Sequence, residues 1–313
     1  MYRLQNPGRN QGTPDPRLTP VYVGRFAPSP TGPLHYGSLV AAVASYLDAR
    51  HNNGLWLLRI EDLDPPRESS EAPVEIMRQL EAYGLHWDGE VLYQSTRLSA
   101  YQDALASLQE STFFCNCSRK STPSVYPGTC REKQLSENTD EPVAVRLRVP
   151  DKTVAIHDLV CGHQKWNLEQ EVGDFIIRRK DYLFAYQLAV VVDDIFQEVT
   201  HVVRGRDLLD STPRQLAIYQ TLGCQAPTYA HLPVVVDDQH VKLSKQAHAR
   251  PVSTSAPMPV LRTILRQLGQ STPAGVDSVS ALLDEAIQNW DIKAITKSTE
   301  LPEPAGIHGA VQT

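Results

Sequence analysis

A loop at residues 24–38 carries the side chains best suited to chemistry, among them Arg25 and His35. It reads GRFAPSPTGPLHYGS, with too many glycines and prolines for a regular helix or strand. Backbone N–H groups in such a loop, and the start of a following helix, attract anions such as phosphate. Arg25 would add a fixed positive charge and His35 a further donor. A proline-rich connection between a strand and a helix, with an incidental Arg and His, fits the same residues equally well.

A strand and a helix are expected to hold this loop in place. Residues 21–23 form a short apolar run that predicts a buried strand. Residues 38–50 repeat apolar side chains at spacings of three and four, which predicts a helix with Ser38 as its N-cap. The unit is therefore a strand, a tight loop and a helix.

Carboxylates follow a second apolar run. Residues 55–60 predict a buried strand, and Glu61 and Asp62 come directly after it. Because ligands bind beyond the carboxyl ends of strands in an open α/β sheet, these carboxylates stand where they could meet one. Solvation in a loop is the alternative. Asp193 and Asp194 could likewise hold a metal, but there loop solvation is the favoured interpretation.

Three cysteines, Cys115, Cys117 and Cys130, lie on a short polar stretch. Thiolates suit zinc, which takes four ligands in a closed structural site. No His lies between Asn116 and Arg131, so the usual ligand types leave the fourth position open. Three reduced cysteines in a loop are the alternative.

The rest of the chain alternates predicted strands and helices, apart from a polar region at 113–180 that we interpret as an inserted subdomain. This alternation is typical of a nucleotide-binding α/β fold. Further strands are expected at 144–149, 153–159, 174–178, 188–192, 200–204 and 231–236, and helices at 69–84 (capped by Ser70), 97–109, 211–223, 260–268 and 279–290.

Composition limits the class of protein. The chain has 313 residues, 41% of them hydrophobic, which suffices for one large or two modest cores. It has no run of about 18 apolar residues, so no membrane span is expected. Five cysteines and no export signal favour the cytoplasm. The formal net charge of −6 counts against nonspecific RNA binding, although 178–180 offers either a basic patch or a solvated turn.

The loop resembles that of class I glutamyl-tRNA synthetases, whose pattern is RFAPSPTGxLHxGS. Residues 35–38, HYGS, correspond to the HIGH element of the class, and 59–64, RIEDLD, match the glutamyl pattern RIEDxD. Residues 242–246, KLSKQ, resemble the KMSKS loop. The resemblance extends from residue 21 to about 268.

The resemblance implies an α/β fold, with a Rossmann-like nucleotide-binding domain of the class I synthetases, an inserted zinc-containing α+β subdomain and a short helical C-terminal region. The expected division is a flexible leader at 1–20, the first catalytic half at 21–112, the zinc or acceptor-type insert at 113–183, the second half with the lysine loop at 184–250, and the helical region and tail at 251–313.

The chemistry that it implies is adenylate formation with ATP and Mg²⁺. Attack of a carboxylate on the α-phosphate builds negative charge, which positioned cations and N–H donors stabilise without a protein nucleophile. His35, Lys242 and Lys245 are the implied catalytic residues. The implied ATP contacts are His35, Gly37, Ser38 and Lys245.

A glutamate ligand needs cations for its carboxylates and a carboxylate for its ammonium group. Arg25 and Arg204 suit the first task and Glu61 the second. Tyr186, expected where the strand at 188–192 begins, would without the resemblance be read as a core tyrosine. The family's glutamate contacts map onto Arg25, Phe26, Ala27, Pro28, Ser29, Glu61, Tyr186 and Arg204.

A short, queuosine-specific branch of this family has a CxC…YxxxC zinc site, which would make Tyr126 the fourth ligand beside the three cysteines. Only residues 251–313 follow Arg250, too few for the large helical anticodon-binding region of an ordinary glutamyl-tRNA synthetase.

The resemblance thus implies a monomeric enzyme that activates glutamate and transfers it to queuosine at the wobble position of tRNA(Asp). Two alternatives stay open, a truncated synthetase that charges tRNA(Glu) and a non-catalytic paralogue that binds glutamate or RNA.

Overall fold

The computed structural model describes residues 22–118, 120, 122–137, 141–243 and 250–305. The leader expected at 1–20 and the predicted catalytic residue Lys245 lie outside these residues. The helices are α1 (Tyr36–His51), α2 (Ala72–Ala82), α3 (Leu98–Ser107), α4 (Tyr186–Phe196), α5 (Thr212–Leu222), α6 (Pro257–Gln267) and α7 (Val279–Gln288). The strands are β1 (Val23–Phe26), β2 (Leu55–Ile60), β3 (Leu92–Tyr93), β4 (Thr112–Cys115), β5 (Ala144–Leu147), β6 (Thr153–Asp158), β7 (Gly162–Asn167), β8 (Phe175–Arg178), β9 (His201–Gly205), β10 (Thr228–Leu232), β11 (Val234–Val236) and β12 (Glu300–Pro302).

Parallel strands form the centre of the molecule. β1, β2 and β3 make one parallel sheet, and β9 and β10 make a parallel pair. A backbone hydrogen bond of 2.9 Å from the Thr200 nitrogen to the Val23 oxygen joins the start of β9 to β1. The first and second halves of the chain therefore bring the carboxyl ends of their strands together, where an α/β sheet binds ligands.

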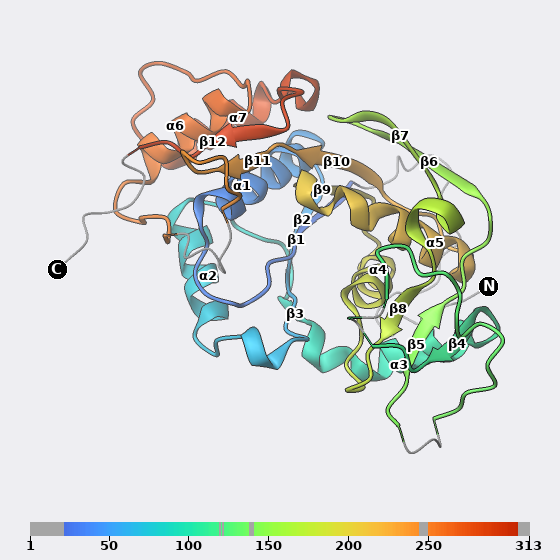
Figure 1. The fold of residues 1–313 in the computed structure, drawn as a ribbon. Coiled ribbons are helices and arrows are strands. Elements are labelled where there is room, and N and C mark those ends of the chain that lie inside the picture. The colour runs from blue at the N-terminus through green and yellow to red at the C-terminus, as the bar shows by residue number, and fades with distance from the viewer. Residues whose placement is uncertain (1–21, 119, 121, 138–140, 244–249, 306–313) are drawn as a thin grey trace, which may run out of the picture.

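Antiparallel strands make up the region that sequence analysis interpreted as an insert. β4, β5 and β8 form one sheet, and β6 and β7 form a hairpin. Figure 1 shows the β4–β5–β8 sheet at the lower right, and α6, α7 and β12 at the upper left, with β1 and β2 between them. The parallel centre thus lies between two peripheral parts.

Two apolar cores support this arrangement. One surrounds α1 and includes Leu39, Trp56 of β2 and Leu261 of α6. The other surrounds α4 and includes Tyr101 of α3 and Leu216 of α5. Because α1 and α4 both begin at the central strand edge, these cores fix the helix starts that face the site.

The strand expected at 188–192 is wrong, because these residues belong to α4. A short, continuous apolar run is compatible with a buried strand or a helix buried on most sides, and periodicity does not separate the two. Asp193 and Asp194, expected in a solvated loop, lie on the same helix and are buried. Tyr186 accordingly opens a helix and not a strand.

Two predicted helix caps are also wrong. α1 begins at Tyr36, and its N-cap is His35 instead of Ser38. α2 begins at Ala72 with Glu71 at the cap position instead of Ser70, because a proline near the helix start favours that first turn. The other predicted helices are confirmed within a few residues of their ends.

Strand boundaries differ from expectation at two places. β1 extends to Phe26, so Arg25 lies in a strand that pairs in parallel with β2, with Arg25 opposite Leu57. The run at 231–236 is divided between β10 and β11. Pro233 separates them because it has no N–H for the ladder.

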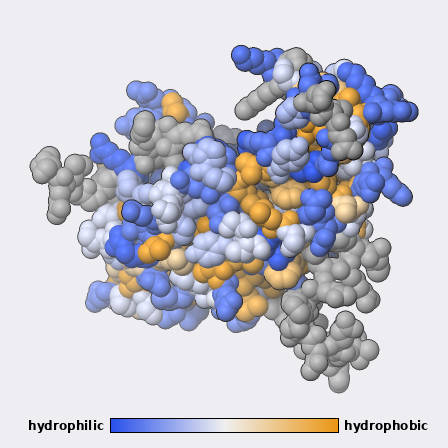
Figure 2. All heavy atoms as spheres, turned by 90° about the horizontal axis from the view of Figure 1, so that it is seen from below, coloured by the Kyte–Doolittle hydropathy of each residue, from blue (hydrophilic) through white to orange (hydrophobic). Residues whose placement is uncertain are grey.

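Over the part of the chain that the structure describes, no helix is both long and apolar enough to cross a membrane. Figure 2 shows one face that is mostly hydrophilic, with apolar residues mainly across its middle.

Candidate active site

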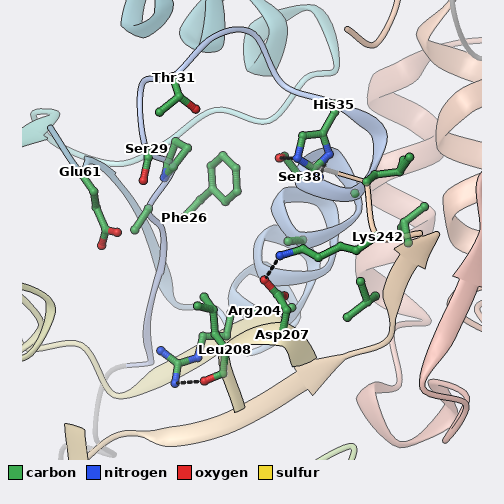
Figure 3. Close-up of a pocket in the computed structure, with 18 of the residues that line it drawn as sticks. Phe26, Ser29, Thr31, His35, Ser38, Glu61, Arg204, Asp207, Leu208 and Lys242 are labelled. Atoms are coloured by element: carbon green, nitrogen blue, oxygen red, sulfur yellow. Dashed lines mark hydrogen bonds and ion pairs between the residues drawn. The ribbon is translucent and has the colours of Figure 1, made fainter. Parts of the chain in front are cut away.

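A cavity of about 680 Å³ opens at the carboxyl ends of the central strands. Its wall comes from β1 and the loop after it, the start of α1, the end of β2, the start of α4 and the segment after β9. Among its lining residues are Arg25, Phe26, Ala27, Pro28, Ser29, His35, Gly37, Ser38, Glu61, Tyr186, Arg204 and Lys242. Every described residue that sequence analysis assigned to glutamate or ATP therefore lines one cavity (Figure 3).

His35 closes the first turn of α1 with its imidazole. Its Nδ1 accepts a hydrogen bond of 3.3 Å from the Ser38 backbone nitrogen, and its Nε2 lies 3.1 Å from the Ser38 hydroxyl oxygen. A Cβ added to Gly37 would lie 3.3 Å from the His35 ring and 3.5 Å from Val235. Glycine thus leaves the imidazole room over the helix start, where backbone N–H groups attract anions.

Arg25 enters the cavity from a network of buried charges. Its guanidinium Nε and Nη2 each lie 3.3 Å from a carboxylate oxygen of Asp194, and it is only 4% exposed. Arg59 also contacts Asp194, at 2.8 Å, and lies 3.4 Å from a carboxylate oxygen of Glu61. Two cations therefore face two carboxylates, and the four charges balance.

The carboxylates of this network respond differently to their surroundings. Burial alone would raise the pKa of Asp194, but the charges of Arg25 and Arg59 lower it below its usual value. Burial raises the pKa of Glu61, and the same two arginines only partly oppose that rise. Glu61 is thus the carboxylate that a cationic ligand group would stabilise most.

Arg204 reaches the cavity from the other half of the chain. Its Nη2 donates to the Leu208 carbonyl oxygen at 3.3 Å (Figure 3). The same nitrogen donates to the Thr212 hydroxyl at 2.9 Å. Its Nε donates to His231 at 3.0 Å, and its Nη1 lies 3.5 Å from the Tyr186 hydroxyl. Arg204 is 4% exposed, so it is as deeply buried as Arg25.

Lys242 borders the cavity near the start of α1 and is half-exposed. Its Nζ lies 2.5 Å from a carboxylate oxygen of Asp207, which also lines the cavity (Figure 3). Asp207 engages one of the three N–H donors of this ammonium group, so the others could meet a phosphate.

The structure adds four residues that were not predicted from the sequence to support the site, namely Arg59, Asp194, His231 and Asp207. Asp207 follows β9 just as Glu61 follows β2, so the rule that ligands bind at strand ends would have found it. Arg59 lies within an apolar run, and the signal that could have found it is its place as the first residue of the RIEDLD match at 59–64. The basic run at 178–180 is not a bare patch, since the Arg178 side chain is buried against Glu137.

The three cysteines form a separate cluster outside the cavity. The sulfur atoms of Cys115, Cys117 and Cys130 lie within 4.8 Å of one another, with 3.6 Å between those of Cys117 and Cys130. The Tyr126 hydroxyl lies 3.6 Å from the Cys115 sulfur and 3.7 Å from the Cys117 sulfur. Tetrahedral zinc with bonds of about 2.3 Å separates its sulfur ligands by about 3.8 Å, so this donor set fits a zinc ion.

Comparison with known proteins defines the class first. The family model described as tRNA synthetases class I (E and Q), catalytic domain, matches residues 21–279. A solved glutamate tRNA ligase from Elizabethkingia meningosepticum, in complex with its amino acid, superposes with a TM-score of 0.75 at 26% identity over 88% of this chain. This chain covers 66% of that longer one. The fold is thus that of a class I tRNA synthetase catalytic domain.

Closer relatives define the family. The glutamyl-Q tRNA(Asp) synthetase of Pseudomonas fluorescens is 47% identical over 289 residues, which cover 90% of this chain and 96% of the relative. That of Citrobacter koseri is 47% identical over 296 residues, which cover 92% of this chain and 96% of the relative. The chain belongs to the glutamyl-Q tRNA(Asp) synthetase family.

Proposed function

We propose that this protein activates L-glutamate with ATP and transfers the glutamyl group to queuosine at the wobble position of tRNA(Asp). Its family membership supports this function. The observation that carries it is one cavity in which two buried guanidinium groups and a buried carboxylate meet at the strand ends. Glutamate has two carboxylates and one ammonium group, so its charges are complementary to Arg25, Arg204 and Glu61.

Adenylate formation is the proposed first step. A carboxylate oxygen of glutamate attacks the α-phosphorus of ATP, and the bond to pyrophosphate breaks. His35 and Lys242, with Lys245 from the same lysine loop, would stabilise the charge on the phosphoryl oxygens, and Gly37 and Ser38 would contact the nucleotide at the start of α1. Mg²⁺ would come with ATP and offset charge on its phosphates.

Acyl transfer is the proposed second step. A hydroxyl of the queuosine cyclopentenediol attacks the acyl carbon of the glutamyl-adenylate, loses its proton and expels AMP. The open cavity mouth would then have to admit the anticodon loop. ATP and tRNA are cytoplasmic, so we propose that the reaction takes place in the cytoplasm. We also propose that the enzyme acts as a monomer.

We further propose a structural zinc ion held by Cys115, Cys117, Tyr126 and Cys130. The hydroxyl of Tyr126 also accepts the backbone N–H of Cys130 at 2.8 Å. Burial raises the pKa of Tyr126 and this hydrogen bond opposes only part of the rise, so the bound metal would have to ionise the phenol. This site would order the insert at 113–183, between catalytic halves at 21–112 and 184–250, with the short helical region at 251–313 after them.

Transfer of labelled glutamate to total tRNA from strains with and without queuosine tests the function. We expect label only on tRNA(Asp) from the queuosine-containing strain. Label on tRNA(Glu) from both strains would contradict the proposal and indicate a truncated synthetase. Absence of glutamate-dependent pyrophosphate exchange would indicate a non-catalytic paralogue instead.

A further inference from the structure

A chain of three buried side chains leads away from the cavity behind Arg204. Arg204 Nε donates to Nε2 of His231 at 3.0 Å, and Nδ1 of His231 lies 2.6 Å from a carboxylate oxygen of Asp158. His231 and Asp158 are both fully buried, at 0% exposure. Neither residue lines the cavity. Arg204 is the cavity-lining residue to which this chain is hydrogen-bonded.

The hydrogen bonds of this chain define the tautomer of His231. Since Arg204 has only donors, Nε2 of His231 must accept, and the ring proton lies on Nδ1 and faces Asp158. The other oxygen of Asp158 accepts backbone N–H groups of Val160 at 3.0 Å, Cys161 at 2.8 Å and His231 at 3.1 Å. Asp158 is thus a fixed anchor, and the imidazole cannot rotate without breaking one of these bonds.

This arrangement orients Arg204 without cancelling its charge. Its Nε and Nη2 are engaged by His231, Thr212 and Leu208, so the guanidinium plane is fixed and Nη1 is the nitrogen next to Tyr186 on the cavity wall. Within the described residues, no carboxylate lies at ion-pair distance from Arg204. An anionic ligand can therefore take the position beside the Arg204 guanidinium that a counterion would otherwise occupy.

We propose that Asp158 and His231 are positioning residues for substrate binding, which hold Arg204 through a neutral imidazole so that its guanidinium binds a carboxylate of glutamate. The inference rests on the proposed function. It goes beyond that function because it assigns a role to two residues that do not touch the ligand.

The anchor comes from the hairpin in the inserted region. Asp158 ends β6, and the next residue, Leu159, donates its backbone N–H to Tyr229 of β10 at 2.9 Å. The Cys161 thiol donates to the His231 carbonyl oxygen at 3.4 Å. The end of the hairpin is therefore docked on β10, and its position determines where Asp158 holds the imidazole.

The protonation behaviour of the pair is consistent with this role. Burial lowers the pKa of His231 below its usual value of 6.5, and the charge of Arg204 lowers it further, while the contact with Asp158 opposes both. Asp207 also raises it, Tyr229 stacks on the ring, and the Cys161 thiol contacts the backbone carbonyl oxygen of His231. Protonation would place a second proton on Nε2 against the Arg204 N–H, so affinity for glutamate should fall as the pH falls through this lowered pKa.

Glutamate-dependent ATP–pyrophosphate exchange tests the proposal with four variants. His231→Leu removes the acceptor, and Asp158→Asn offers an amide N–H that forces the opposite tautomer, as a carboxamide does beside a catalytic histidine. We expect each to raise KM for glutamate about tenfold or more, the value of a hydrogen bond to a charged group, with KM for ATP unchanged. His231→Gln restores an acceptor near the position of Nε2 and should recover most of the affinity for glutamate. Because glutamine does not titrate, this variant should not lose affinity for glutamate as the pH falls.

Tyr229→Phe is the matched control, because Tyr229 stacks on His231 and its buried hydroxyl has no hydrogen-bond partner within the described residues. We expect it to leave KM for glutamate unchanged. The inference alone would be overturned if the wild-type protein catalyses glutamate-dependent pyrophosphate exchange while the folded His231→Leu and Asp158→Asn variants keep normal KM values for glutamate. Equal rises in KM for glutamate and ATP would also overturn it, and a wild-type protein without exchange would overturn it together with the proposed function.

Discussion

Arg25 and Arg204 reach the same cavity from opposite halves of the chain, but the protein stabilises their charges in different ways. Arg25 faces the carboxylate of Asp194, which it shares with Arg59. Arg204 faces the neutral imidazole of His231. Both are equally buried, so burial alone does not explain the difference.

The comparison shows two ways of keeping a guanidinium group inside a protein. A direct counterion compensates the cost of burial but reduces the field that a ligand experiences. A neutral acceptor fixes the orientation of the guanidinium group and leaves its positive charge to be neutralised by the ligand. We therefore expect Arg25 to matter for both folding and binding, and Arg204 mainly for binding.

The largest effect is expected for Asp194→Asn, which leaves Arg25 and Arg59 buried without their shared counterion. Breaking a buried ion pair by changing one partner costs about 3–5 kcal/mol, so urea unfolding should show a loss of that order. Asp207→Asn is the matched control, since its ion pair with half-exposed Lys242 contributes about 1 kcal/mol at most. Equal losses in both variants would contradict the distinction.

The same ion pairs predict a pH dependence of stability. The pKa of Asp194 is lower in the folded protein than in the unfolded chain. Its contribution is therefore fully present above the unfolded pKa and is lost as the pH falls through the folded one. Asp194→Asn should remove this part of the acid destabilisation.

A direct comparison of the two arginines comes next in size. Arg25→Gln and Arg204→Gln should each raise KM for glutamate about a hundredfold, because each removes a charged hydrogen bond to the ligand. Only Arg25→Gln leaves a buried carboxylate with a lost partner, whereas Arg204→Gln takes donors from neutral acceptors. Arg25→Gln should therefore lower the free energy of unfolding more than Arg204→Gln does, by about 1–3 kcal/mol. The measurements are pyrophosphate exchange and urea unfolding. Equal stability of the two variants would show that Asp194 needs Arg59 alone.

The smallest effect on the cavity is expected from the cysteine cluster. Cys130→Ser should abolish stoichiometric zinc in metal analysis of the purified protein and lower its melting temperature. It should change KM for glutamate by no more than about twofold. The cluster lies outside the cavity that Arg25 and Arg204 line, and a structural metal acts through folding. Cys224→Ser serves as the control, since Cys224 lies outside the cluster. A large rise in KM for glutamate would link the insert to the site by a route other than Asp158.

Much of the site was predictable where function depends on neighbours in sequence. The loop from Arg25 to Ser38, the helix after it and Glu61 at the end of β2 follow from local patterns, and the structure brings them into one cavity. The roles assigned to these residues stay predictions. The prediction of a strand at 188–192 was wrong because its run of apolar residues suits a buried strand and a buried helix equally. The packing of α3 and α5 around α4 decides between the two.

Local patterns in the sequence were enough to specify the strand–loop–helix around His35, the cysteine spacing and the lysine pair. Which charges meet depends on how the chain packs. Asp194 lies 169 residues from Arg25, and Asp158 lies 73 residues from His231. A buried charge is tolerable only where a partner is brought to it, and that partner is selected by how distant strands and helices pack, which no local pattern records.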